Sequence, residues 1–169
     1  MAAIAQKKLL ALDTNFLLDL AGKAAFARDF KEYFQSLGFQ FLVPPTVVME
    51  LTFAAEEENG EKRALARKAL DNFTRWRIQP FGMTAVETDI TGGFSQRLRE
   101  KGLLPFEEVN DGIILAETSL GGISILITRD KHLLDIDETS LSMAFNDADW
   151  TPVNPAHPKR LLQSARRIL

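Results

Sequence analysis

Cysteine is absent from this sequence, and histidine occurs only twice, as His132 and His157. A chain without cysteine forms no disulfide, no zinc–thiolate site and no catalytic thiolate. Two histidines are too few for a histidine-rich metal site, and a Ser-His-Asp apparatus is not expected. Any metal chemistry therefore has to use oxygen ligands, which points to magnesium or manganese.

Long hydrophobic runs and an excess of positive charge are also missing. No segment approaches the roughly 20 apolar residues that a membrane span requires, and residues 1–8 lack the apolar stretch of a signal peptide. We therefore expect a cytoplasmic protein with no membrane contact. The net charge of −3 argues against a surface that attracts nucleic acid everywhere, but it leaves room for local basic faces.

The length and the hydrophobic pattern indicate one α/β domain. A chain of 169 residues is long enough for a substantial core. Short apolar runs at 9–12, 39–43 and 123–128 are typical of buried strands, and helical patterns lie between them. Alternating strands and helices imply parallel strands joined by right-handed crossovers. We expect a single-domain α/β/α sandwich around a mainly parallel central sheet.

Local signals place the remaining elements. Thr84 and Glu87 have the spacing of a capping box, and Asn110 is the expected N-cap of a later helix. The expected helices cover residues 15–37 with a break at Gly22, a segment that opens at Pro45, and residues 61–76, 84–101, 110–120 and 159–169. Further short strands are expected at 78–81, 141–145 and 150–153. The predicted organisation is an N-terminal extension at 1–8, the main domain at 9–155 and a basic C-terminal helix at 156–169.

The predicted topology places four acidic side chains at one edge of the sheet. Asp13 and Asp130 directly follow predicted strands, while Glu50 and Asp111 lie in the early turns of predicted helices. In a parallel sheet the carboxyl ends of the strands share one edge, and the following helices begin there. Each acid alone also fits a structural role, Asp13 and Asp111 as helix caps and Glu50 as a solvated side chain. Together they predict a shared carboxylate cluster.

Four clustered carboxylates repel one another and raise each other's pKa unless a cation compensates. Hard divalent cations with oxygen ligands suit such a cluster, so we expect one or two Mg²⁺ or Mn²⁺ ions. Ions held in this way can activate a water and stabilise the charge of a phosphodiester during cleavage. A nucleophilic side chain is then not required, which agrees with the missing cysteine.

Four segments that carry these acids resemble the acidic motifs of PIN-domain nucleases, in the order of that family. They are Leu12–Asn15, Val47–Leu51, Asp111–Ala116 and Ile127–Leu133. The stretch from Trp150 to Leu162 is similar to the end of VapC-type chains, so the resemblance covers about residues 9–162. It implies metal binding and catalysis by Asp13, Glu50, Asp111 and Asp130, with support from Thr14, Asn15 and Thr128.

The same resemblance implies metal-dependent cleavage of RNA. Many bacterial members of the family are toxins that a small antitoxin neutralises, and they are commonly homodimers. The expected partners are therefore an RNA substrate, an antitoxin and a second copy of this chain.

Several further charged side chains lie near these motifs. Basic residues are candidates for contacting RNA, although such faces are more often merely solvated. The candidates are Lys62, Arg63, Arg67, Lys68, Arg129 and Lys131. Among the remaining acids, Glu107 and Glu108 are expected to be solvated and Asp135 to lie at the surface. Glu117 joins the cluster only if its side chain turns back toward Asp111.

Two other function classes stay open. The first is a protein of this fold that binds RNA or protein without cutting, although keeping four mutually repelling acids argues against it. The second is a phosphate-transfer domain. A phosphatase of the haloacid-dehalogenase type needs a second acid two residues after the first, where Asn15 stands. A receiver-like switch needs a phosphoacceptor on a middle strand, whereas the second strand ends at Pro44-Pro45.

Overall fold

Five parallel strands form a single sheet at the centre of the molecule. The computed structural model describes residues 7–57 and 59–168. The strand order is β3-β2-β1-β4-β5, and every neighbouring pair is parallel. The strands are β1 (Leu9–Leu12), β2 (Gln40–Val43), β3 (Ile78–Pro80), β4 (Ile125–Ile127) and β5 (Asn154–Ala156).

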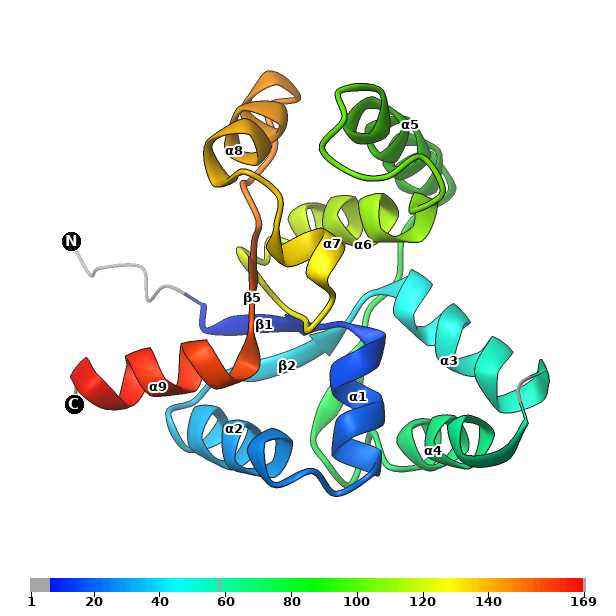
Figure 1. Ribbon diagram of the computed structural model, residues 1–169, viewed down its shortest axis with the longest axis vertical. Coiled ribbons are helices and arrows are strands. Elements are labelled where there is room, and N and C mark those ends of the chain that lie inside the picture. Colours follow the sequence, from blue (N-terminus) through cyan, green and yellow to red (C-terminus); the bar gives the residue numbers. More distant parts are fainter. Residues whose placement is uncertain (1–6, 58, 169) are drawn as a thin grey trace.

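Helices cover both faces of this sheet, as Figure 1 shows. One side carries α1 (Thr14–Ala21), α2 (Ala25–Ser36), α4 (Gly60–Asp71) and α9 (Pro158–Ile168). The other side carries α5 (Ala85–Glu100), α6 (Val109–Leu120) and α8 (Glu138–Asp147), while α3 (Pro45–Glu57) packs against α4 and α6. The short helix α7 (Lys131–Leu134) follows β4. The predicted α/β/α sandwich with its parallel sheet is therefore confirmed. Within the described ranges, no helix has both the length and the apolar character needed to cross a bilayer.

The core explains why the chain folds around β1. Leu10, Ala11 and Leu12 are fully buried, as expected for a central strand covered on both faces. Beneath it, the ring of Phe30 lies 5.3 Å from that of Phe16 and 6.0 Å from that of Phe41, which joins α2 to α1 and β2. Each buried aromatic or aliphatic side chain contributes roughly 1.5–3 kcal/mol to the stability of the fold. These contacts therefore hold α1 and α2 in place beside the sheet.

Two of the expected strands are wrong. Residues 141–145 lie in α8, because Leu141, Ala144 and Phe145 bury one helical face, with spacings of three and four residues, and the Asp137 side chain caps the helix. The final strand is not at 150–153 but at residues 154–156. It contains Pro155, which a sheet tolerates there because β5 is an edge strand.

The predicted helix signals are confirmed in part. The chain breaks after α1 at Gly22, and Thr84 and Glu87 form the predicted capping box at the start of α5. Asn110 is not an N-cap, since α6 begins one residue earlier, at Val109. The helix expected at 61–76 ends at Asp71, and turns follow it.

Gly112 allows α5 and α6 to pack closely. A Cβ atom at this position would lie 2.8 Å from the backbone Cα of Ser95 and 2.7 Å from its Cβ, distances that real side chains do not adopt. The same Ser95 donates a hydrogen bond from Oγ to the carbonyl of Val109 (2.7 Å). Glycine in a helix costs about 1 kcal/mol, and here it allows the start of α6 to lie directly on α5.

We predict that Gly112→Ala lowers the free energy of unfolding by about 1–3 kcal/mol, because the added methyl group forces the two helices apart. Urea unfolding of the purified chain measures this change. Gly93→Ala is the matched control, since a Cβ there meets no atom within 4 Å and alanine favours the helix by up to about 1 kcal/mol. Equal stability of the two variants would contradict the close-packing explanation.

Candidate functional site

The fold brings the four predicted acids to the carboxyl edge of the sheet. Asp13 directly follows β1, and Asp130 lies three residues after β4, just before α7. Glu50 lies in the second turn of α3, and Asp111 lies in the first turn of α6. Asp130, Asp13 and Glu50 all act electrostatically on the Asp111 carboxyl group, so the four acids share one environment.

A hydrogen-bond network orients the acids that follow the two central strands. Thr128 is fully buried and donates from Oγ1 to Oδ2 of Asp13 (2.7 Å). The same hydroxyl oxygen accepts bonds from the backbone N–H of Asp130 (2.9 Å) and from Nδ2 of Asn15 (3.2 Å). Asn15 also donates to Oδ2 of Asp13 (3.2 Å) and accepts from the backbone N–H of Arg129 (2.9 Å). Asn15 and Thr128 thus hold both acids in fixed positions.

Glu50 is held by partners on two other helices. Thr14 donates from Oγ1 to Oε1 of Glu50 (2.6 Å), and Asn110 donates from Nδ2 to Oε2 (3.4 Å). Asn110 was expected to cap its own helix, but one residue inside α6 its side chain faces α3 instead. Glu50 is half-buried and points to these partners rather than to solvent alone.

Burial and repulsion favour protonation of two of the acids. Asp13 is 4% exposed, and desolvation raises its pKa to about 6, although hydrogen bonds from Thr128 and Thr14 partly oppose that shift. Asp111 is 7% exposed, and its pKa is raised to about 8 by desolvation and by the neighbouring carboxylates, Asp130 foremost. Such shifts arise where negative charge gathers without a compensating cation.

One oxygen of the Asp111 carboxylate also lacks a hydrogen-bond donor in the described part of the chain. This atom, Oδ2, is buried. Ligand atoms of Asp111, Glu108 and His132 lie within 4.8 Å of one another, and Nδ1 of His132 is 3.1 Å from Oε1 of Glu108. A buried carboxylate normally has a partner, so this grouping fits a cation with mixed oxygen and nitrogen ligands.

Glu108 and His132 are functional candidates that the sequence pattern did not identify. Glu108 was expected to be solvated, but it is half-buried and faces the cluster, because α6 starts earlier than predicted. Two signals in the sequence were available for these candidates. Glu108 lies three residues, about one helical turn, before Asp111, and His132 lies two residues after Asp130.

The other acids near the motifs do not join this cluster. Both oxygens of Glu117 accept bonds from Thr46, one from its backbone N–H and one from its hydroxyl, each at 3.0 Å. Glu107 and Asp135 are exposed, as expected.

The basic side chains predicted to contact RNA differ in their partners and surroundings. Arg129 makes a bidentate ion pair with Asp19, in which Nη2 lies 2.8 Å from Oδ1 and Nε donates to Oδ2. Arg63 and Arg67 donate to the carbonyl of Ala55 (3.2 and 3.1 Å). Lys131 is exposed on α7, whereas Lys62 and Lys68 line two different hollows.

The hollow next to Glu50 has an apolar wall. It measures about 340 Å³, and Thr14, Asn110 and Lys62 also line it. Met49 and Phe53 on α3 are 54% and 61% exposed beside it. Exposed aromatic and thioether side chains of this kind can pack against a nucleotide base.

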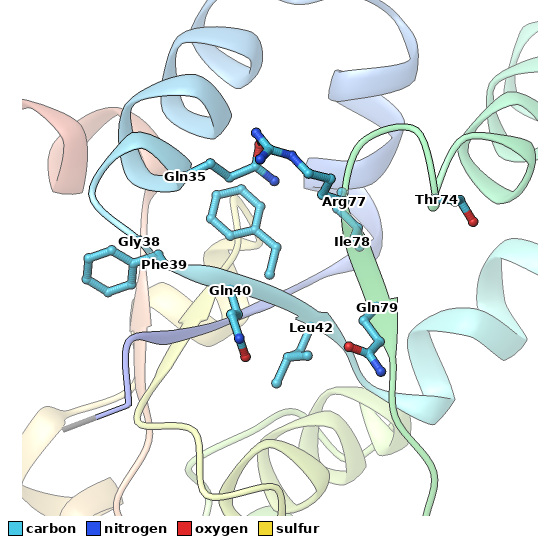
Figure 2. A pocket seen from close by; sticks show the side chains of 10 residues that line it. Gln35, Gly38, Phe39, Gln40, Leu42, Thr74, Arg77, Ile78 and Gln79 are labelled. Carbon is cyan, nitrogen blue, oxygen red and sulfur yellow. The ribbon is translucent and has the colours of Figure 1, made fainter. Parts of the chain in front are cut away.

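Another hollow lies at the opposite edge of the sheet. It has a volume of about 480 Å³ and is lined by the first residues of β2 and β3. Figure 2 shows the side chains of Gln35 and Arg77 close together on one side of it. Its ten lining residues include no carboxylate, so it is separate from the acidic cluster.

Comparisons with known proteins agree with this geometry. A family model described as the PIN domain matches residues 10–139. A comparison with curated protein sequences finds no match. One similar solved chain comes from the crystal structure of VapBC2 from Rickettsia felis bound to a DNA fragment from its promoter. It is 17% identical to this chain, with a TM-score of 0.59, and the match covers 88% of this chain and 98% of that chain.

Two further solved structures contain similar chains. VapBC-1 from nontypeable Haemophilus influenzae has 14% identity and a TM-score of 0.55, covering 89% of this chain and 98% of that one. FitAcB from Neisseria gonorrhoeae has 18% identity and a TM-score of 0.52, covering 88% and 97%. At these identities the likeness shows the fold, whereas the family model spans most of the sequence. The four acidic segments and this match lead to one conclusion: the chain belongs to the PIN-domain family.

Proposed function

We propose that this chain is a Mg²⁺- or Mn²⁺-dependent endoribonuclease that hydrolyses RNA phosphodiester bonds at the carboxylate edge. The observation that carries the proposal is the buried Asp111 carboxylate, which lies among other acids and has one oxygen without a hydrogen-bond donor in the described structure. Membership of the PIN-domain family supports a nuclease role. The sequence contains no cysteine that could serve as a nucleophile.

One or two divalent ions would be held by Asp13, Glu50, Asp111 and Asp130, with Glu108 and His132 as additional ligands beside Asp111. A divalent cation bound here supplies charge stabilisation at the phosphodiester and makes an attacking water more acidic.

The chain's own residues keep the ligands in place for this chemistry. Thr128 and Asn15 fix the direction of Oδ2 of Asp13, and Thr14 fixes one oxygen of Glu50. Rotation of these carboxylates would break hydrogen bonds, so the ligands are pre-organised. The hollow lined by Met49, Phe53 and Lys62 beside Glu50 would receive a nucleotide next to the cleaved bond.

A protein partner is part of the proposal. The similar solved chains come from structures named VapBC2, VapBC-1 and FitAcB. Their likeness over 88–89% of this chain supports a toxin role, in which a small antitoxin binds the nuclease and blocks it. We also propose a homodimer as the form of the free chain.

Asp111→Asn is expected to abolish Mn²⁺-dependent cleavage of single-stranded RNA, with a loss of at least about a hundredfold, because a ligand charge is removed. Release of fragments from end-labelled RNA measures this, with and without chelator. The matched control is Asp135→Asn, an exposed acid at the C-terminal end of α7, which should cleave as the native chain does. Cleavage that survives both chelator and Asp111→Asn would contradict the proposal.

Without divalent cations, the folded state should lose stability as the pH rises from about 4 to about 8. The pKa values of Asp13 and Asp111 rise from 3.8 to about 6 and about 8 in the native state, so the folded chain binds more protons than the unfolded chain in this window. Their contribution is therefore fully present below pH 4 and is lost as the pH passes the native pKa values.

Asp111→Asn should remove part of this decline and raise the free energy of unfolding at pH 8 by roughly 1–3 kcal/mol. Urea unfolding with chelator at pH 5 and pH 8 measures the difference between variant and native chain. If the free energy of unfolding depended on pH in the same way in both proteins, the ionised Asp111 carboxylate would not destabilise the folded state.

His132→Gln is expected to reduce the thermal stabilisation by Mn²⁺ more than that by Mg²⁺. Magnesium prefers a set of oxygen ligands alone, whereas an imidazole nitrogen adds affinity for a transition metal. The melting temperature with increasing concentrations of each ion measures the effect. His157→Gln, at the start of α9, is the control. Equal loss for both ions, or no loss, would remove His132 from the ligand set.

A further inference from the structure

A separate hollow, away from the carboxylates, gathers positive charge. It lies between the C-terminal end of α1, helix α2 and the end of α4, and it has a volume of about 400 Å³. The molecule as a whole carries a net charge of −3, yet one acid, Glu32, faces five cations here. The five cations are Lys23, Arg28, Lys31, Lys68 and Arg75. We call this group the basic hollow.

Glu32 is the one carboxylate among the residues that line the basic hollow, and although its charge raises the pKa of Lys31, the cations outnumber it five to one. None of these five cations forms an ion pair with another residue that the structure describes. Instead, Nζ of Lys31 donates to Oε1 of Gln35 (3.3 Å), and Nη2 of Arg77 donates to the same oxygen (3.5 Å). Burial and the positive charge of Arg77 lower the pKa of Lys31. Two cations that share one neutral acceptor would be stabilised by a bound anion.

The wall of the basic hollow also offers an aromatic surface. Trp76 lines it and is half-buried, and its carbonyl accepts a hydrogen bond from Nε2 of Gln35 (2.8 Å), which holds the turn against α2. Tryptophan faces stack on unpaired bases, and the combination of cations and an aromatic face is typical of sites for single-stranded nucleic acid. A phosphate alone would need no aromatic neighbour.

The backbone fixes two of the surrounding cations. Lys23 and Arg77 have φ values of 60° and 56°, in the left-handed region that residues other than glycine rarely adopt. Hydrogen bonds from their N–H groups to Leu20 and Thr74 (each 3.1 Å) hold the two turns. These bonds fix the course of the two turns; Lys23 lines the basic hollow, whereas Arg77 lines the hollow at the start of β2 and β3.

Helix α1 connects the basic hollow to the carboxylate edge. Its first residue, Thr14, bonds to Glu50, and Leu20 near its last turn lines the basic hollow. Eight helical residues span about 12 Å, a distance that a few nucleotides of an extended strand cover. Building on the proposed RNA cleavage, we propose that the basic hollow binds the phosphates and one unpaired base of single-stranded RNA to one side of the bond that is cut.

The test measures RNA binding in chelator, so that no cleavage is required. Fluorescence anisotropy of a labelled single-stranded RNA follows binding to the full chain and to the double variant Lys31→Gln/Arg75→Gln over a range of salt concentrations. We expect the variant to bind at least about tenfold more weakly at low salt. Its plot of log affinity against log salt should be shallower by about 1.4, the value for two lost phosphate contacts on a single strand.

The matched control is Arg97→Gln/Lys101→Gln, which removes the same charge from the end of α5. Figure 1 shows that this helix lies on the other side of the sheet from α2 and α4. The control should change the affinity less than twofold. Because removing Lys31 and Arg75 relieves repulsion, the double variant should unfold at the same urea concentration as the native chain or a higher one, so a folding defect does not explain weaker binding.

Four results would overturn the proposal: equal affinity for the double variant and the native chain, equal weakening by the control, a lower unfolding midpoint for the double variant, or binding of duplex DNA as tight and as sensitive to the variant as that of the single strand.

With Mn²⁺ present, the double variant should need at least about tenfold more RNA for half-maximal cleavage. If the native chain binds RNA as predicted but cleaves none, the proposed nuclease function fails while the basic hollow stands. If it cleaves RNA and the double variant binds normally, only the basic hollow fails.

Discussion

The hydroxyl group of Thr128 is the contact on which the candidate site depends, because it joins the ends of the two central strands. It donates to Asp13 after β1 and accepts from the backbone of Asp130 after β4. Since these strands are parallel neighbours, both acids leave the sheet at the same edge. The fold thus holds together carboxylates that would separate in a free chain, and their repulsion and desolvation have to be offset elsewhere. A divalent cation bound there, as proposed, would offset both at the site itself.

Packing on one face of the sheet fixes the position of Asp111, the acid at the start of α6. Ser95 on α5 bonds to the carbonyl of Val109 and touches Gly112, so the first turn of α6 is fixed from both sides of Asp111. Asp111 is therefore held at the start of α6 with its carboxylate buried beside the other acids. On the opposite face, the phenylalanine cluster around Phe30 anchors α1. The core thus provides the stability that the clustered acids take away.

Sequence patterns predict the parts of this molecule that depend on local order along the chain. Asp13 and Asp130 follow apolar runs, and a parallel sheet leaves such residues only one edge to occupy. The additional candidates Glu108 and His132 were missed, because their role depends on where α6 starts and on how α7 turns toward it. The edge strand at 154–156 is short and contains proline, so it gives almost no strand signal. Lys68, which lines the basic hollow, was among the predicted RNA contacts, but the residues that α1 and α2 contribute to this hollow could not be predicted to lie beside it from a local pattern.

The central claim is that the carboxylate edge binds a divalent cation through Asp111. A crystal of the native chain soaked in Mn²⁺ tests this claim most directly, because anomalous scattering locates the ion without reference to activity. We predict a peak about 2.0–2.3 Å from an Asp111 oxygen, with Asp13, Asp130 or His132 among the other ligands. Full occupancy at another site, with the Asp111 carboxylate ordered and no peak beside it, would contradict the account.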